Sequence, residues 1–419
     1  MTSKLEELIA ELCPNGVEYK ALKKCVFKID NIKWKNYNGN DKSYIDLSSV
    51  DIDRHIVICY QSINAVSAPS RAQQIIKKND VLFGTTRPML RRYCIIDDLY
   101  NDEICSTGFC VLRANPDVVL PRWIYHIIST NDFFAYIENN QNGASYPSIS
   151  DSLVKDFEIP VPSLEVQSEI VRILDTFTEL TAELTAELTA RKKQYEYYRD
   201  TLLTFDDNNP LHSLISRYCP NGVEYKKIGD IASVDRGGSL QKKDFCEHGI
   251  PCIHYGQIYT KYGLFASKSY TFIDSECASK QRFAHKNDIV MAVTSENIED
   301  VCKCVAWFGE EDVAVSGHSA IIRHNQNAKY LVYYFHSSMF FLQKKKLAHG
   351  TKVIEVTPSD LLDVKIPVPP LEVQRQIVQI LDRFDALCND LTQGLPAEIE
   401  ARRKQYEYYR DQLLTFKRA

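Results

Sequence analysis

The chain has 419 residues, 44% of them hydrophobic and 25% charged, an ordinary composition for a folded protein with room for two domains. Its formal net charge of −5 argues against a protein that coats nucleic acid unaided, because any basic surface must be local or come from a partner. No apolar run has the length of a signal-peptide core or a membrane span, so we expect a cytoplasmic protein without membrane contact. The thirteen cysteines lack zinc-ligand spacing, and we expect reduced thiols and no metal.

Three segments occur twice along the chain, in the same order. They are CPNGVEYK at 13–20 and 219–226, IPVPSLEVQ with its continuation at 159–180 and 366–387, and RKKQYEYYRDTLLTF at 191–205 and 402–416. The stretches between them, 21–158 and 227–365, have nearly equal lengths but little evident identity. A repeat of this size fixes the architecture before other signals are considered. It predicts two diverged domains on a shared frame, with segments 1–162, 163–205, 206–369 and 370–419.

The shared frame is predicted to be helical. From 163 to 205, apolar residues recur every three or four positions, and neither glycine nor proline interrupts them. At about 1.5 Å per residue, this helix would be about 64 Å long. The second copy, 370–419, carries the same stripe, although Gly394 and Pro396 should kink or divide the helix. Each stripe is too narrow to be stable alone, which predicts that the two helices pack as a coiled coil.

Within the first helix, residues 181–188 read TAELTAEL, a four-residue unit written twice. Low-complexity drift in a good helix former is the simpler explanation. Each unit, however, adds about 6 Å and a net rotation of about 40°. This rotation is close to the ~36° twist of one DNA base pair. The segment is therefore interpreted as a spacer whose length can change in fixed steps.

The two diverged stretches keep one apolar skeleton. KNDVLFGTTRPM at 78–89 aligns with KNDIVMAVTSEN at 286–297, and both predict a charged turn, a short buried strand and a polar loop. Further on, NGASYPS at 142–148 aligns with HGTKVIE at 349–355. Buried positions keep their character while loop tips change, which is what two binding specificities on one fold require. The predicted fold class is α+β, with two similar α/β domains joined by two long helices; neutral loop drift is the alternative explanation.

No catalytic motif is found. The sequence lacks a GxxxxGK[ST] phosphate loop, GxGxxG after a strand, GxSxG, HExxH and an NPPY-like tetrapeptide, so we expect no enzyme activity in the chain alone. Loop tips and basic clusters are candidate DNA contacts, since arginine suits guanine edges and lysine suits phosphates, although each could be a solvated face. The candidates are Thr85, Thr86, Arg87, Arg91, Ser145, Tyr146, Arg236, Lys242, Lys243, Thr294, Ser295, Asn297, His349, Thr351 and Lys352.

Taken together, the repeated motifs resemble the specificity (S) subunits of Type I restriction-modification systems over essentially the whole chain. The resemblance implies a non-catalytic subunit that binds a bipartite, asymmetric double-stranded DNA target, with one half-site per target-recognition domain. It also implies two methyltransferase (M) subunits that carry S-adenosylmethionine, and restriction (R) subunits that use ATP and Mg. No cofactor is expected in this chain. The alternatives are a non-enzymatic scaffold whose domains bind proteins or glycans, and a self-sufficient methyltransferase or nuclease, which the missing motifs disfavour.

For such a protein, the long helices should run antiparallel and convert a direct repeat into an internal pseudo-two-fold. Their exposed charges are candidates for contacts with M, although a solvated helix face is an equal alternative. These residues are Lys192, Lys193, Arg403 and Lys404.

Overall fold

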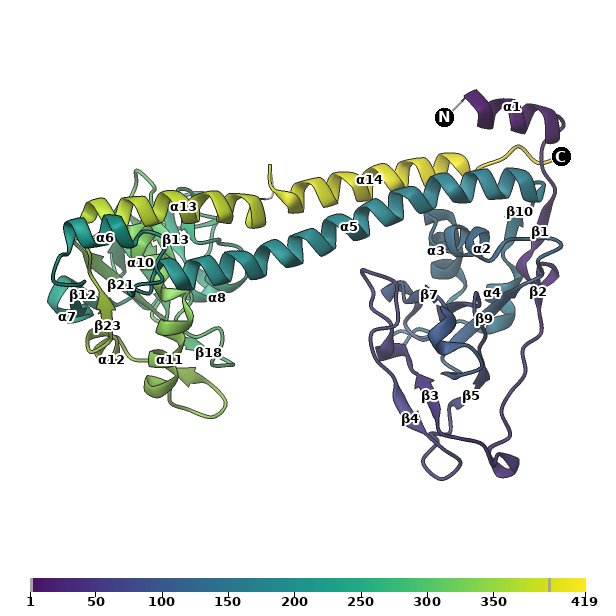
Figure 1. Ribbon diagram of the computed structural model, residues 1–419, viewed down its shortest axis with the longest axis horizontal. Coiled ribbons are helices and arrows are strands. Elements are labelled where there is room, and N and C mark those ends of the chain that lie inside the picture. Colours follow the sequence, from purple (N-terminus) through teal and green to yellow (C-terminus); the bar gives the residue numbers. More distant parts are fainter. Residues whose placement is uncertain (1–2, 391–392) are drawn as a thin grey trace. The chain divides into compact units, whose positions relative to one another are not determined.

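The computed structural model describes residues 3–390 and 393–419 (Figure 1). The chain forms two compact units. Unit 1 combines residues up to 185 with 399–419, and unit 2 consists of 186–398. Their boundary at Thr185 falls inside the TAELTAEL segment. No helix among the described residues combines the length and apolar character needed to span a bilayer.

Unit 1 is built on two four-stranded sheets. One has the strand order β2-β9-β6-β7, and the other has the order β4-β3-β8-β5 with β3 and β8 parallel. The elements of this unit, including the two helices that it shares with unit 2, are α1 (Ser3–Leu12), β1 (Tyr19–Ala21), β2 (Val26–Phe27), β3 (Lys42–Ile45), β4 (Gln61–Ile63), β5 (Ala72–Ile75), β6 (Val81–Gly84), β7 (Tyr93–Ile95), β8 (Ile104–Ser106), β9 (Phe109–Ala114), α2 (Pro121–Ile127), α3 (Asn131–Asn140), α4 (Asp151–Asp156), β10 (Glu158–Pro160), α5 (Leu164–Leu202) and α14 (Leu395–Leu413).

Unit 2 repeats this plan. Its sheets have the orders β12-β21-β17-β19-β14 and β15-β13-β20-β16, and β13 and β20 are parallel. The remaining elements of the chain belong to it: α6 (His212–Tyr218), β11 (Tyr225–Lys227), α7 (Ile228–Ile231), β12 (Ala232–Arg236), β13 (Ile250–Ile253), α8 (Tyr255–Thr260), β14 (Phe265–Ala266), β15 (Thr271–Ile273), α9 (Ser275–Ala278), β16 (Arg282–Ala284), β17 (Ile289–Ala292), β18 (Thr294–Ser295), β19 (Cys304–Trp307), β20 (Val313–Val315), β21 (Ser319–His324), α10 (Ala328–Phe335), α11 (Ser338–Leu347), β22 (Ile354–Glu355), α12 (Pro358–Leu362), β23 (Lys365–Pro367) and α13 (Leu371–Asn389).

The central strands confirm that the two domains are related. β6 (VLFG) and β17 (IVMA) are buried along their whole length, as their unbroken apolar sequences predict. Val81 faces Leu112 in unit 1, and Ile289 faces Ile322 in unit 2. This shared register is the one obtained by aligning the two KND segments. β14 extends the sheet of unit 2 beyond the common plan.

The charged turn before each central strand has a physical cause. Asn79 and Asn287 have positive φ angles of 68° and 75°, in the left-handed region that asparagine tolerates better than most residues. In unit 1, the turn places the next residue, Asp80, 2.7 Å from Arg113 of β9. The KND motif is therefore a left-handed turn that starts the strand. In unit 1 it also places the buried carboxylate of Asp80 where it can pair with Arg113.

The helical frame follows the prediction with one division. The predicted helix 163–205 is α5, of 39 residues. The second helix is divided into α13 and α14, as Gly394 and Pro396 predict. Residues 391 and 392, between these two helices, lie outside the described part of the chain.

Within each unit, two helices pack antiparallel. Figure 1 shows the start of α5 beside the end of α14 in unit 1. There the rings of Phe177 and Tyr409 stack with centroids 5.4 Å apart, and in unit 2 the rings of Tyr198 and Phe384 stack at 5.1 Å. Phe177 and Phe384 are equivalent in the repeat, and so are the two tyrosines. The antiparallel pairing is confirmed, and each domain packs on the ending of the other repeat.

The hydrophobic cores show that the endings of the two repeats are exchanged between the units. Leu413 and Leu414, from the end of the second repeat, are 4% and 5% exposed within the core of unit 1. Their equivalents Leu202 and Leu203, from the end of the first repeat, are 1% and 0% exposed within the core of unit 2. Neither domain therefore completes its core with its own repeat.

His336 at the end of α10 should make unit 2 sensitive to acid. Burial lowers the pKa of His336 to about 4, and its Nδ1 lies 2.8 Å from the carbonyl oxygen of Val332. The unfolded chain takes up a proton below about pH 6.5 whereas the folded chain does not, so stability falls as pH drops from 6.5 towards 4. Between pH 7.5 and 5, we expect the wild type to lose about 2 kcal/mol more than His336→Gln in urea unfolding. Equal losses would show that this histidine is not responsible.

Candidate nucleic-acid interface

In unit 1, two loops that are far apart in sequence form one surface. The segment that leaves β6, residues 85–92, is named exit loop 1, and residues 142–148 are named hairpin 1. Thr86 bridges to Ser148, and the amide of Arg87 donates to the carbonyl oxygen of Pro147 at 2.7 Å. The sequence had identified both loops, and the structure brings them together.

Glycine closes this hairpin. Gly143 has a φ angle of +100°, and a Cβ placed there would lie 3.0 Å from the carbonyl oxygen of Tyr146. The hairpin is also closed by paired hydrogen bonds between the backbones of Asn142 and Ser148, both of 2.8 Å. A residue other than glycine would be strained at this turn.

Unit 2 contains an equivalent pair of loops. After β17, exit loop 2 (293–300) includes β18, which pairs with β22 at the end of hairpin 2 (349–355). Hairpin 2 closes through paired hydrogen bonds between His349 and Glu355, and Gly350 has a φ angle of +105°. The aligned glycines therefore perform the same task in both units.

The tip of unit 1 presents a cation stacked on an aromatic ring. The guanidinium of Arg87 lies 4.2 Å from the ring centroid of Tyr146, a side chain that is 71% exposed. Arg87 and Arg91 both have positive φ angles, 49° and 55°, on either side of a short turn that begins at Pro88. Arg91 lies over Phe134 at 4.4 Å, and Ser145 is exposed beside Tyr146. A preorganised, exposed arginine and a hydroxyl-bearing tip can donate to base edges or to phosphates.

The tip of unit 2 has a different chemistry. His349, Thr351 and Lys352 are exposed on hairpin 2, and Asn297 is exposed on exit loop 2. Within the described residues, no hydrogen bond or ion pair engages the ammonium of Lys352. Ser295, where unit 1 has Arg87, is half-buried. The same backbone frame thus offers an arginine and a tyrosine in one unit, and a lysine, a threonine and a histidine in the other.

Two predicted contacts are corrected by their burial. Thr85 is 6% exposed and its hydroxyl donates to the carbonyl oxygen of Gly108 at 2.9 Å. Thr294 is 5% exposed and its hydroxyl lies 3.1 Å from Nδ1 of His318. Both lie within two residues of the end of a buried strand, and their side chains still point into the domain. They hold the exit loops in place and are not part of the exposed surface.

Arg236 is also placed differently from the prediction. Its guanidinium pairs with the carboxylate of Glu355 and reaches the carbonyl oxygen of Gly317 at 3.3 Å. It thus ties hairpin 2 to the turn before β21 and is 42% exposed while doing so. Lys242 and Lys243 lie on a separate exposed turn that follows β12.

The sequence did not single out Tyr255 and His318 together. Their rings lie 5.0 Å apart, beside exit loop 2, and His318 is exposed. Next to them, the hydroxyl of Tyr259 donates to the carbonyl oxygen of Thr294 at 2.7 Å. One signal was available in the sequence, because VSGHSAIIR at 315–323 is one residue longer than the similar segment STGFCVLR at 106–113.

The predicted helix charges are exposed on the frame. Lys192 and Lys193 are exposed on α5. On α14, Arg403 lies 4.0 Å from Asp53, and Lys404 pairs with Glu400 at 3.5 Å. Two of the four candidates therefore already have acidic neighbours within unit 1.

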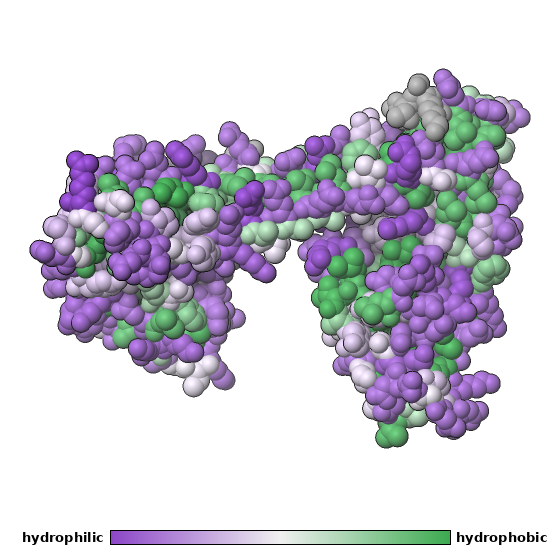
Figure 2. Space-filling model, in the orientation of Figure 1, coloured by the Kyte–Doolittle hydropathy of each residue, from purple (hydrophilic) through white to green (hydrophobic). Residues whose placement is uncertain are grey.

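Unit 1 also exposes apolar side chains beside its sheet. Figure 2 shows hydrophobic surface on this unit, near β7 of Figure 1. The loop between β3 and β4 contributes large side chains that are 41–54% exposed, and such clustering is typical of a contact surface. These residues are Ile52, Ile56, Ile58 and Tyr60.

Comparison with known proteins agrees with this geometry. A family model described as Type I restriction modification DNA specificity domain matches residues 17–191 and 220–401. The chain is 38% identical over 281 residues to the EcoR124I/EcoR124II specificity subunit of a type I restriction enzyme from Escherichia coli, over 64% of this chain and 65% of that protein. It is 31% identical over 308 residues to a protein of Haemophilus influenzae assigned as a type I restriction enzyme specificity subunit, over 70% of this chain and 72% of that protein. The chain thus spans slightly less than two thirds of the Escherichia coli relative.

Solved structures share the fold. A chain from a type I R-M system, studied for complex assembly and conformational transition, has a TM-score of 0.65 at 24% identity and covers 96% of this chain and 98% of its own length. An S subunit of a Type-I restriction-modification system from M. genitalium has a TM-score of 0.54 at 13% identity, over 96% of this chain and 97% of its own length. Because the family model covers both domains and most of the helical frame, the chain belongs to the family of type I restriction-modification DNA specificity subunits.

Proposed function

We propose that this chain is the non-catalytic, DNA-reading subunit of a type I restriction-modification complex, and that each unit reads one half of a bipartite, asymmetric target. The observation that carries the proposal is the paired exit loop and hairpin, present in both units on one backbone frame but tipped with different side chains. Identical tips would favour a symmetric target. Different tips favour two unlike half-sites, because base edges are distinguished by the donors and acceptors that meet them.

We assign the chemistry to partner subunits. Two methyltransferase subunits would bring S-adenosylmethionine, and restriction subunits would bring ATP and Mg. The helical frame and the apolar loop of unit 1 are the surfaces that we assign to these partners, since large apolar side chains are costly to leave in water. The complex would act in the cytoplasm, where its DNA is. A glycan or protein scaffold is not favoured for a member of this family.

The experiment that tests the proposal replaces one of the two DNA-recognition domains. Residues 21–158 are replaced by the corresponding region of a relative, and the methylated motif of the host is determined by methylome sequencing. We expect one half of the motif to change and the other half and the gap to remain, because the two cores share no strand. A change in both halves would contradict the assignment of one half-site to each unit.

A single substitution tests the tip of unit 1. Arg87→Ala should weaken DNA binding by about 1–3 kcal/mol and relax base choice in one half-site only, as expected for a bidentate arginine contact. Arg87→Lys keeps the charge but not the planar fork, so it should recover affinity more than base choice. Affinity is measured by fluorescence polarisation of the assembled complex at fixed salt. Unchanged affinity and motif in Arg87→Ala would make this arginine a bystander.

A further inference from the structure

The motif CPNGVEYK has a covered edge in unit 1. Residues 416–419, named the tail strand, lie along it as a short parallel strand. The amide of Val17 donates to the carbonyl oxygen of Lys417 at 2.8 Å, and the amide of Ala419 donates back to the carbonyl oxygen of Val17 at 3.1 Å. Both polar groups of Val17 are therefore satisfied by the tail strand.

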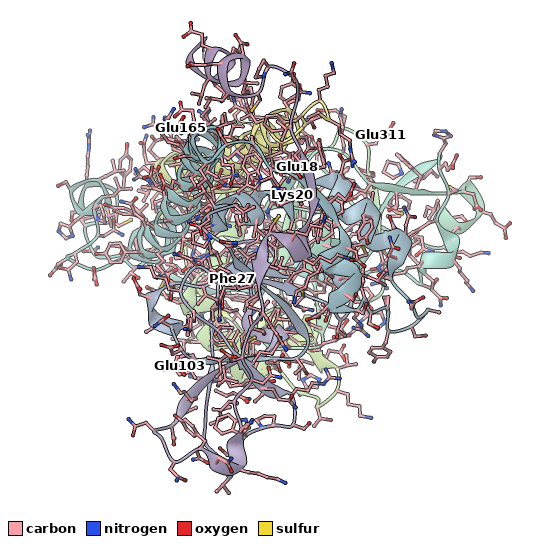
Figure 3. The ribbon with its side chains drawn as sticks, turned by 90° about the vertical axis from the view of Figure 1, so that its right-hand side faces the viewer. Glu18, Lys20, Phe27, Glu103, Glu165 and Glu311 are labelled. Atoms are coloured by element: carbon pink, nitrogen blue, oxygen red, sulfur yellow. The ribbon has the colours of Figure 1, made fainter. Side chains whose placement is uncertain are left out.

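Side chains strengthen this contact. The hydroxyl of Tyr19 donates to the carbonyl oxygen of Phe416 at 3.0 Å. The guanidinium of Arg418 lies 4.3 Å from the ring centroid of Tyr19 and pairs with Glu158 at 2.8 Å. Figure 3 labels Glu18, just before β1, and Lys20 on β1, which form their own ion pair at 3.0 Å. The ring of Tyr19 and the carboxylate of Glu158 thus both favour a cationic side chain at position 418.

The identical motif in unit 2 has an open edge. Within the described residues, the amide and carbonyl of Val223 make no hydrogen bond. A Cβ placed on Gly222 would meet nothing within 4 Å, whereas one placed on Gly16 would lie 2.6 Å from the carbonyl oxygen of Lys417. Tyr225, the equivalent of Tyr19, is 53% exposed. The same sequence that holds a strand in unit 1 is therefore bare in unit 2.

The path of the chain after Phe205 explains why the edge of Val223 is open. The residues that follow Phe205 correspond to the tail strand, but they turn away towards α6. Asn209 fixes this turn: it is 3% exposed, and its amide nitrogen lies 2.7 Å from the carbonyl oxygen of Thr204 and 3.1 Å from that of Leu202. The first repeat must continue into the second domain, so its ending cannot cover the edge of Val223.

The charges beside the open edge differ from those in unit 1. The position of Glu158 is taken by Lys365, which is exposed, while the tyrosine ring is kept. Asp206 lies close enough to Tyr225 to help raise the pKa of that phenol, after burial as the main cause. Lys365 occupies the position from which Glu158 pairs with Arg418 in unit 1. We therefore take Lys365 as the deciding charge: it would attract an acidic side chain at the place of Arg418 and repel an arginine, although Asp206 acts in the opposite direction.

We propose that the edge of Val223 binds an extended segment of a partner protein, added as a short parallel strand, with an acidic residue where unit 1 has Arg418. Exposed strand edges bind peptides in this way, with the main chain supplying affinity and neighbouring side chains supplying selectivity. The motif also borders an open groove of about 440 Å³, lined in part by Pro220, Glu224 and Leu371, which can receive a longer segment. The tail strand of a second copy fits less well, since its basic residues would face Lys365.

The test uses the whole chain and two synthetic peptides. One is acetyl-TFKRA-amide, which copies the tail strand, and the other is acetyl-TFKEA-amide, which carries an acid in place of the arginine. The chain is deuterated and labelled with ¹⁵N-valine, and each peptide is titrated to millimolar concentration while the amide signals are followed. Val223 reports on the open edge, and Val17 is a matched internal control because the tail strand already covers it.

We expect TFKEA to shift the signal of Val223 and leave that of Val17 in place. It should bind about five-fold more tightly than TFKRA, the scale expected for exchanging an exposed like-charge contact for an ion pair. Lys365→Glu should reverse this preference, and N-methylation of the alanine of TFKEA should abolish binding by removing the donor to Val223. A silent Val223, tighter binding of TFKRA to the wild type, or no effect of N-methylation would overturn the proposal.

Discussion

Leu413→Ala should destabilise unit 1, although Leu413 belongs to the second repeat. The side chain is 4% exposed in the core of that unit, and alanine leaves a cavity that neighbouring side chains fill only in part. We expect a loss of about 2–5 kcal/mol, the usual range for a buried leucine. The measurement is hydrogen exchange followed by mass spectrometry, which resolves peptides of the two units in one experiment.

Leu202→Ala is the matched variant, because Leu202 occupies the same place in the repeat. It is 1% exposed in the core of unit 2, so that unit should exchange faster while unit 1 keeps its protection. The two variants together thus show whether a leucine stabilises the domain that precedes it in sequence or the domain in whose core it packs. If each substitution loosened the domain that precedes it in sequence, the exchange of endings between repeats would be wrong.

The frame could be predicted because its signals are local or repeated. A seam with steps of three and four identified α5, and Gly394 and Pro396 identified the division between α13 and α14. The exchange of endings between the repeats was not predicted from the sequence, although it is a consequence of the antiparallel pairing. When the long helices of a direct repeat pack antiparallel, the end of each helix lies beside the start of the other.

The paired loops could be predicted in outline for a similar reason. Gly143 and Gly350 align, and the structure gives both a positive φ angle in equivalent hairpins. Sequence alone could not give the direction of each side chain. Thr85 and Thr294 were chosen because they lie in the polar loops that differ between the two copies, but both side chains point inward and bind partners there.

Long side chains set a further limit on what sequence can give. Arg236 was expected to face DNA, yet it binds Glu355, a residue 119 positions away. Nothing in the local pattern distinguishes an arginine that reaches a ligand from one that reaches a distant loop. The covered and open copies of CPNGVEYK illustrate the same limit, because identical residues have different neighbours in the two units.

Deleting Thr185 to Leu188 should shorten the DNA gap by one base pair. The deletion removes one TAEL unit from α5 and keeps the four-residue rhythm of half-buried Leu184 and its successors, so the helix should persist. It shortens α5 by about 6 Å and rotates its two ends by about 40° relative to each other. DNA changes by ~3.4 Å and roughly 36° per base pair, so rotation favours a loss of one pair whereas translation alone would favour two.

Rotation should decide the outcome, because a domain that approaches the wrong groove face loses its base contacts, whereas a coiled coil can absorb part of a shift along its axis. Methylome sequencing of a host that carries the deletion variant should show both half-sites unchanged and the gap one base pair shorter. Substituting the same four residues by AAEL keeps the length and serves as the matched control, so its motif should be that of the wild type. An active deletion variant with the original gap would show that α5 does not set the distance between half-sites.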